Sequence, residues 1–149
     1  VGKFFGLAGI RLGFTFAVQG VLNKLAKAMG PWSVNGPGQF VASAALNDTQ
    51  WQADMRAQLV GEELQQLQLW QPSMNRLGAE LATSHALFRS FIMTSNLAHK
   101  IHHSAAKSGL LLRLVEINSS ASLLRFGNID LGHMSAVKHC QTWIRQEFE

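Results

Sequence analysis

The sequence is 149 residues long, 47% of its residues are apolar, and its formal net charge is +4. Such a chain can bury a hydrophobic core, and its low content of charged residues (15%) argues against disorder and against a coiled coil. The basic residues are scattered rather than clustered, and the longest apolar runs are too short to cross a bilayer. We therefore expect neither a nucleic-acid nor a membrane partner.

The cysteine content and the first residues of the sequence bear on the cellular location of the protein. Cys140 is the only cysteine, so no internal disulfide can form, which fits a reducing, cytoplasmic location. The chain begins without Met and shows no signal peptide. Because it opens inside what resembles a motif, we interpret it as a piece of a longer protein.

The first part of the chain combines glycine with bulky apolar residues. Glycine recurs at every third or fourth position of the opening segment, which disfavours a helix and predicts a loop that leads into a buried strand at 14–18. Apolar residues at helical spacing then predict a helix over 20–29 that ends at Gly30. Pro37 suits the first turn of a further helix that runs to Leu46.

The remainder alternates between helical and strand patterns. A long helix is predicted from Thr49, capped by Asn47 or Asp48, with Trp51 and Trp70 as packing residues. Pro72 should kink or end it. The later predicted elements are a strand at 87–94, a helix from an N-cap at 94–96 to Ser108, two strands at 110–115 and 122–126, and an amphipathic helix at 134–147.

Lys3 is the first residue that could carry chemistry. It lies among glycines and apolar residues, and Arg11 follows it eight positions later. Apolar surroundings and a neighbouring cation lower the pKa of a lysine, which makes its amine nucleophilic, and the arginine fork suits a phosphate. The residues alone also leave open a solvated lysine in a glycine-rich loop.

A family resemblance makes the nucleophilic interpretation more specific. The fold-type I aminotransferase superfamily has a cofactor-lysine segment that resembles residues 2–14, GKFFGLAGIRLGF. Together with the loop at 30–37, GPWSVNGP, the segment is similar to that of the threonine-phosphate decarboxylases of cobalamin synthesis, close relatives of the histidinol-phosphate aminotransferases. The resemblance implies that pyridoxal 5'-phosphate is the cofactor, that Lys3 binds it covalently and that Arg11 holds its phosphate.

Two later arginines extend the resemblance. Arg125 lies in LLRFG, where the superfamily has an arginine for the substrate carboxylate, and Arg113 lies in GLLLRLVE, which resembles a segment whose arginine helps to hold the substrate's phosphate. An arginine fork pairs with a carboxylate through two parallel hydrogen bonds. Considered singly, each arginine also fits a surface salt bridge.

The resemblance also implies a fold and an activity. The fold would be α/β: the end of a large cofactor-binding domain over 1–45, and a small α+β domain over 46–149 in which helices cover one side of a sheet. The activity would be decarboxylation of L-threonine O-3-phosphate to aminopropanol phosphate in cobalamin biosynthesis, by a cytoplasmic homodimer. The alternatives are a histidinol-phosphate-type aminotransferase and a non-catalytic, truncated dimerisation module. Because the family's other site residues precede the lysine, we expect the fragment alone to be weakly active or inactive.

A histidine cluster raises a separate possibility. His99 and His103 are four residues apart and share a helix face, as two metal ligands would, whereas His102 points elsewhere. No carboxylate or cysteine lies close in sequence, so a solvated or partner-facing helix surface is favoured and no metal site is expected.

Overall fold

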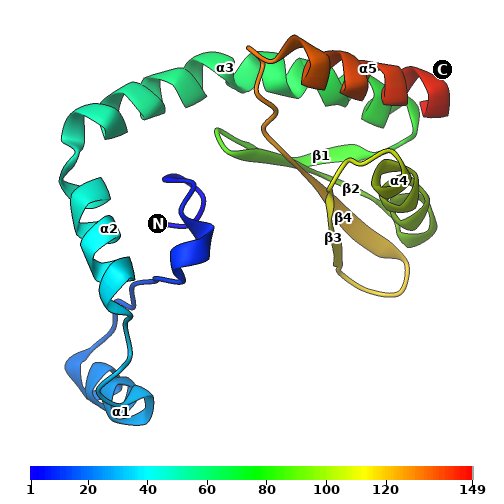
Figure 1. The fold of residues 1–149 in the computed structure, drawn as a ribbon. Coiled ribbons are helices and arrows are strands. Elements are labelled where there is room, and N and C mark those ends of the chain that lie inside the picture. The colour runs from blue at the N-terminus through cyan, green and yellow to red at the C-terminus, as the bar shows by residue number, and fades with distance from the viewer. Residues whose placement is uncertain (149) are drawn as a thin grey trace. The chain divides into compact units, whose positions relative to one another are not determined.

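The computed structural model describes residues 1–148, which form two compact units: Val1–Arg56, and the chain from Ala57 onward. Figure 1 shows the elements. In chain order they are η1 (Ala8–Ile10), α1 (Gln19–Met29), α2 (Gly36–Asn47), α3 (Thr49–Arg76), β1 (Glu80–His85), β2 (Phe88–Thr94), α4 (Ser95–Lys107), β3 (Arg113–Glu116), β4 (Ala121–Gly127) and α5 (Met134–Phe148). The boundary predicted after residue 45 falls in the last turn of α2, ahead of the division between these units.

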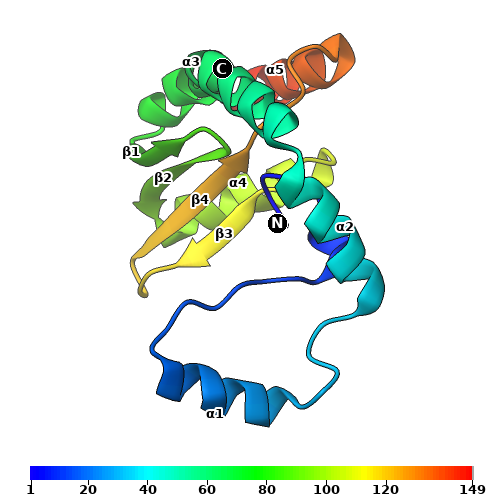
Figure 2. The same cartoon turned by 90° about the vertical axis from the view of Figure 1, so that its left-hand side faces the viewer.

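The opening segment is a loop with one turn of 3₁₀ helix, η1, and the predicted strand at 14–18 is wrong. Residues 12–18 form a loop without regular secondary structure, and they pair with no strand among the described residues (Figure 2). Phe14 and Phe16 are exposed rather than buried. An isolated extended segment has no hydrogen-bonded neighbour to stabilise it, so apolar composition alone does not make it a strand.

Helices α1 and α2 lie within one residue of their predicted bounds, and α3 begins at Thr49 as predicted. Gly30 stops α1 with a φ of 69°, a conformation that glycine adopts without steric cost. Asn35 caps α2, since its Oδ1 accepts a hydrogen bond from the N–H of Gly38 at 2.6 Å, and a proline occupies the first turn. Asp48 caps α3 by accepting from the N–H of Trp51 at 2.9 Å.

The long helix α3 runs on past Pro72 to Arg76, so the proline does not end it. Proline removes one backbone hydrogen bond from a helix and crowds the preceding turn. Trp70, Ser73 and Met74 are buried on either side of it. Their packing holds the last turns of α3 in place and offsets the lost bond.

The second unit contains a four-stranded antiparallel sheet in the order β1-β2-β4-β3. The predicted strands at 87–94, 110–115 and 122–126 correspond to β2, β3 and β4. Strand β1 was not predicted. Its sequence, ELATSH, lacks a regular apolar alternation, and it forms at the sheet edge because a tight turn returns the chain against β2.

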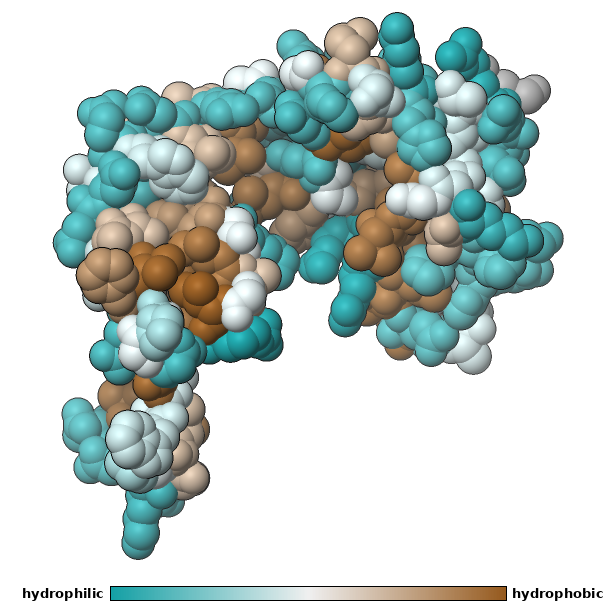
Figure 3. Space-filling view, viewed as in Figure 1, coloured by the Kyte–Doolittle hydropathy of each residue, from teal (hydrophilic) through white to brown (hydrophobic). Residues whose placement is uncertain are grey.

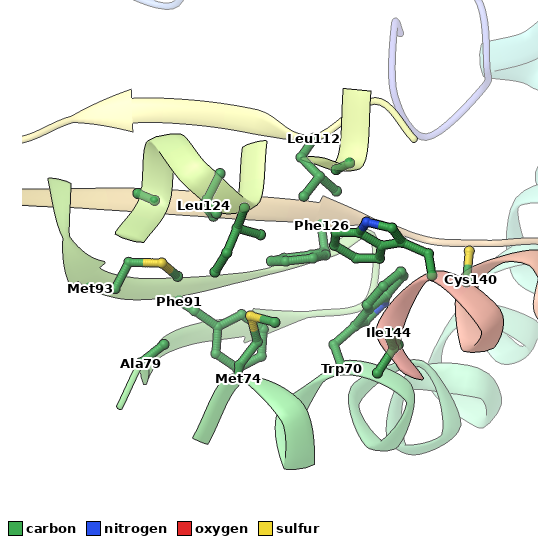
Figure 4. Close-up of a cluster of buried hydrophobic side chains, with 14 residues drawn as sticks. Trp70, Met74, Ala79, Phe91, Met93, Leu112, Leu124, Phe126, Cys140 and Ile144 are labelled. Atoms are coloured by element: carbon green, nitrogen blue, oxygen red, sulfur yellow. The ribbon is translucent and has the colours of Figure 1, made fainter. Parts of the chain in front are cut away.

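Helices α3, α4 and α5 pack against one face of this sheet, as predicted. Burial alternates along β4, so that Leu124 and Phe126 point into the core while Arg125 points to the opposite face. Figure 4 shows the resulting cluster. Its buried members are Trp70, Met74, Ala79, Phe91, Met93, Ala98, Ile101, Ala105, Leu112, Leu124, Phe126, Cys140, Trp143 and Ile144.

Buried Arg89 links three parts of the second unit. Its Nη1 donates to Oε1 of Gln66 at 3.2 Å, and its Nη2 donates to Oδ1 of Asn128 at 2.7 Å. Burial lowers the pKa of the guanidinium, an effect that Glu63 partly offsets. Since Gln66 also bonds both backbone polar groups of Ile129, the network ties α3 and β2 to the segment that follows β4.

The first unit leaves large apolar side chains uncovered. Figure 3 shows apolar atoms gathered over the opening segment beside α2. Phe16 is 93% exposed and Trp32 is 91% exposed. Over the described part of the chain, no helix combines the length and the apolar character needed to cross a bilayer.

Candidate functional site

Lys3 and Arg11 line one hollow in the first unit. The hollow has a volume of about 350 Å³. It is bounded by Gly2, Lys3, Leu7, Ala8, Arg11, Leu12 and Gly13. Two glycines in this wall leave room for a ligand to approach the backbone closely, and the two charged residues that line it are both cations.

The position of Arg11 depends on an unusual backbone conformation. Arg11 ends η1 in the left-handed region, with a φ of 53°, and its Nη1 donates to the carbonyl of Ala8 at 3.3 Å. The carbonyl of Ile10 accepts a hydrogen bond from Nδ2 of Asn35 at 3.0 Å. The arginine is therefore placed by one hydrogen bond through its side chain and one through the peptide that precedes it.

The backbone around Lys3 is held by the packing of the two aromatic residues that follow it, and not by an interaction of the Lys3 amine. The Phe5 ring stacks on Trp51 with centroids 5.4 Å apart, and the Phe4 ring meets Trp51 edge-on at 5.6 Å. The guanidinium of Arg56 lies 5.3 Å from the centroid of the Phe4 ring. Lys3 itself is exposed, and its amine forms no hydrogen bond or ion pair with any described residue. No side chain of the described residues therefore occupies the Lys3 amine.

Arg113 and Arg125 are directly opposite each other on β3 and β4. Side chains of directly paired residues project from the same face of a sheet, here the face away from the helices. Among the described residues, neither guanidinium forms an ion pair with a carboxylate. Like charges in such positions destabilise a sheet by up to about 1 kcal/mol, so the arrangement favours an anionic ligand between them.

Phe88 supports one of these two arginines. The guanidinium carbon of Arg125 lies 4.9 Å from the centroid of the Phe88 ring, and Arg125 is half-buried while Arg113 is exposed. A cation above an aromatic face is attracted to the ring and loses some of its rotational freedom. Arg125 is therefore the better ordered of the pair.

The four residues proposed from the sequence thus form two pairs. Lys3 and Arg11 share a hollow in the first unit, and Arg113 and Arg125 share a sheet face in the second. Sequence reasoning did not identify Asn35 as part of the first pair's surroundings. Its signal was present, since an asparagine before Gly-Pro is typical of a helix N-cap, but its bond to residue 10 has no local signature.

The histidine cluster does not gather into one group. Nε2 of His99 lies 3.2 Å from Oε1 of Glu116, and both side chains are exposed. Within residues 1–148, no three histidine, cysteine or acidic side chains lie close enough together to hold a metal ion.

Comparison with known proteins identifies related sequences. The model of the family "Aminotransferase class I and II" matches residues 1–122, which include Lys3, Arg11 and Arg113 but not Arg125. The chain is 39% identical over 124 residues to a threonine-phosphate decarboxylase of Pseudomonas aeruginosa, covering 82% of the chain and 35% of that protein.

Two further relatives match different lengths of the chain. A threonine-phosphate decarboxylase of Sinorhizobium sp. is 51% identical over 45 residues, covering 30% of the chain and 14% of that protein. A histidinol-phosphate aminotransferase of Methylobacillus flagellatus is 30% identical over 123 residues, covering 83% of the chain and 32% of that protein. The chain spans about a third of the length of the relatives that match most of it.

Proposed function

Because the chain belongs to the aminotransferase class I and II family, we propose that it forms the C-terminal part of an enzyme that uses pyridoxal 5'-phosphate. Its mixture of helices with an antiparallel sheet agrees with a fragment of that fold. In the proposal Lys3 binds the cofactor covalently and Arg11 holds its phosphate. The observation that carries the proposal is that Lys3 and Arg11 line one hollow.

The residues around the hollow fit this cofactor chemically. Pyridoxal phosphate offers an aldehyde, which a primary amine attacks, and a phosphate, which a guanidinium binds through charge-assisted hydrogen bonds. Lys3 and Arg11 supply those two groups. The glycines at positions 2 and 13 keep bulky side chains out of the wall between them.

The substrate proposed is L-threonine O-3-phosphate, which would be decarboxylated to aminopropanol phosphate for cobalamin biosynthesis. Two of the relatives are threonine-phosphate decarboxylases, which supports this choice. A phosphorylated amino acid carries two anionic groups, and Arg113 and Arg125 present two cations on one sheet face. We assign the phosphate to Arg113 and the carboxylate to Arg125, in a cytoplasmic enzyme that acts as a homodimer.

Each residue then has a defined role in the reaction. When bound, pyridoxal phosphate supplies an electron sink for the charge left at Cα after a bond there is broken. Arg11 would hold the phosphate of the cofactor, and Lys3 would hold its aldehyde carbon. Arg125 fixes the direction of the substrate carboxylate, which decides whether carbon dioxide or the Cα proton leaves. The Lys3 amine would move a proton to or from Cα.

A second candidate function is transamination of a histidinol-phosphate-type substrate. The relative from Methylobacillus flagellatus supports it, since it covers as much of the chain as the decarboxylase relative does. That substrate carries a phosphate, which Arg113 would bind in the same way, but it has no carboxylate for Arg125. The amino group would pass to a keto acid, whose carboxylate Arg125 would then bind, so the two candidates differ in which molecule Arg125 contacts.

An assay of the full-length enzyme with O-phosphothreonine separates the candidates. We expect release of carbon dioxide without a keto acid, and Arg113→Gln should raise KM for O-phosphothreonine more than for threonine. The matched control is Arg145→Gln, which changes an exposed arginine on α5. With a keto acid added as the amino acceptor, formation of a keto acid from O-phosphothreonine would instead identify an aminotransferase, and no turnover of O-phosphothreonine or of histidinol phosphate would favour a non-catalytic module.

A further inference from the structure

We propose that Asn35 is a positioning residue for the cofactor's phosphate, because it fixes the peptide immediately before Arg11 and so holds that guanidinium at the hollow shared with Lys3. The inference rests on the proposed function, in which Arg11 binds the phosphate. Asn35 itself contacts neither the cofactor nor the substrate in this account. All the contacts involved lie within the first unit.

Arg11 needs an external constraint to keep its conformation. It is the one residue other than glycine with a positive φ in the described part of the chain. The left-handed region brings a Cβ close to backbone oxygen and is disfavoured for any residue with a side chain. Arg11 also lies in an exposed loop, and its local hydrogen bond, from Nη1 to the Ala8 carbonyl, does not fix the peptide before it. Without a specific contact, the backbone would relax and carry the guanidinium away from the hollow.

Asn35 supplies that contact at the peptide bond between Ile10 and Arg11. The carbonyl of Ile10 and the N–H of Arg11 belong to one peptide plane. The φ angle of Arg11 is the rotation about the N–Cα bond that joins this plane to the rest of the residue. Nδ2 of Asn35 donates to the Ile10 carbonyl at 3.0 Å, so the plane is anchored across 25 residues of sequence. The tether therefore restricts the angle that is strained.

The orientation of the Asn35 amide is itself determined. Its Oδ1 accepts from the N–H of Gly38 at 2.6 Å while its Nδ2 donates to Ile10, and a flipped amide would satisfy neither contact. A Cβ at position 38 would lie 2.8 Å from Oδ1 and 2.9 Å from Nδ2. Only glycine at this position leaves the amide where it is.

Asn35→Asp in the full-length enzyme separates the tether from the helix cap. Aspartate still accepts from Gly38 and caps α2, but it cannot donate to Ile10 and places a carboxylate against that carbonyl. We expect the affinity of the apoenzyme for pyridoxal phosphate to fall roughly five- to tenfold, the effect of losing one hydrogen bond. Affinity for pyridoxal, which lacks the phosphate, should not change. Both are measured from the visible absorbance of the bound form.

Two controls match these changes. Asn47→Asp makes the same substitution at the far end of α2, where Nδ2 donates to the Ser43 carbonyl at 2.9 Å, and it should leave both affinities unchanged. Gly38→Ala displaces the Asn35 amide without adding charge and should reproduce the loss. Gly36→Ala, where nothing lies within 4 Å of the added Cβ, should not.

Arg11→Gln distinguishes a failure of this inference from a failure of the proposed function. If Asn35 acts through Arg11, then Asn35→Asp should have no further effect once Arg11 is glutamine. An unchanged ratio of the two affinities in both Asn35→Asp and Gly38→Ala, with Arg11→Gln lowering it, would overturn the inference alone. If Arg11→Gln also left the ratio unchanged, the proposed phosphate site would fail, and this inference with it.

Discussion

Arg125 owes its proposed role to the shape of its side chain as well as to its charge. It lies opposite Arg113, and its guanidinium lies against the Phe88 ring. It forms no ion pair with a carboxylate of the described residues. Lysine would keep the charge but lose the paired donors and the flat surface that stacks on the ring. The contribution of this residue can therefore be measured with a substitution that conserves charge.

We expect Arg125→Lys to raise KM for O-phosphothreonine by roughly thirtyfold, which corresponds to about 2 kcal/mol for a charge-assisted pair. The affinity of the enzyme for pyridoxal phosphate should stay the same. Steady-state kinetics with a separate cofactor titration measure both quantities. Arg145→Lys on α5 is the control. A loss of cofactor affinity in Arg125→Lys, with KM unchanged, would contradict the assignment.

The buried thiol of Cys140 should make the free energy of unfolding depend on pH. Burial raises the pKa of its thiol above the ordinary value of 9.0. In the unfolded chain the thiol ionises near 9.0, so above that pH the unfolded state holds fewer protons than the folded state, and the free energy of unfolding falls as pH rises. Urea denaturation between pH 8 and pH 10 should show this fall, and Cys140→Ala should make it shallower. An identical slope in both proteins would show that another group is responsible.

The candidate residues differed in how far the sequence could identify them. Lys3 and Arg11 are eight positions apart in one motif, so their closeness could be predicted from their short separation in sequence. Arg113 and Arg125 were identified separately, and their direct pairing became visible only with the β3–β4 register. Asn35 was missed because its bond to Ile10 joins segments that are distant in sequence, and no local pattern encodes such a contact.

At the scale of elements, the helices were predicted because their signals are local. Besides their apolar spacing, α1 has a terminal glycine, α2 has a capping side chain, and α4 has a capping side chain with a glycine just beyond its end. Strands depend on partners elsewhere in the chain. The apolar segment at 14–18 has no strand partner among the described residues and is not a strand, whereas the polar β1 has β2 beside it and is one.

Replacement of two glycines by alanine tests this local account, because the two substitutions should change the free energy of unfolding in opposite directions. Gly109 follows α4 with a φ of 75°, and nothing lies within 4 Å of a Cβ added there, so Gly109→Ala should cost about 1 kcal/mol through backbone strain alone. Gly61 is inside α3 with equally open surroundings, so Gly61→Ala should stabilise by about 0.5–1 kcal/mol. Urea unfolding of both variants measures the difference. A destabilising Gly61→Ala would contradict it.

At the scale of the whole molecule, the two units differ in how well they bury their apolar side chains. The core cluster lies entirely in the second unit, whereas the first leaves Phe14 and Phe16 exposed by 58% and 93%. Burial of apolar area is the main favourable term in folding. The 149-residue chain alone should therefore be protected unevenly along its length.

Limited proteolysis with chymotrypsin measures that difference. We expect early cleavage after Phe14 and Phe16 and a longer-lived fragment that retains the second unit, where Phe91 and Phe126 are fully buried. Mass spectrometry of the fragments identifies the cut sites. Loss of the second unit as fast as the first would show that it does not hold its fold in the isolated chain.

The central claim is that Lys3 binds pyridoxal phosphate covalently, and borohydride reduction tests it most directly. The full-length enzyme is incubated with the cofactor, reduced and digested, and its peptides are mapped by mass spectrometry. The account predicts a phosphopyridoxyl group on the peptide that contains Lys3, and no such group there in Lys3→Ala. Absence of the label, or a label on Lys24 or Lys27 in its place, would contradict the account.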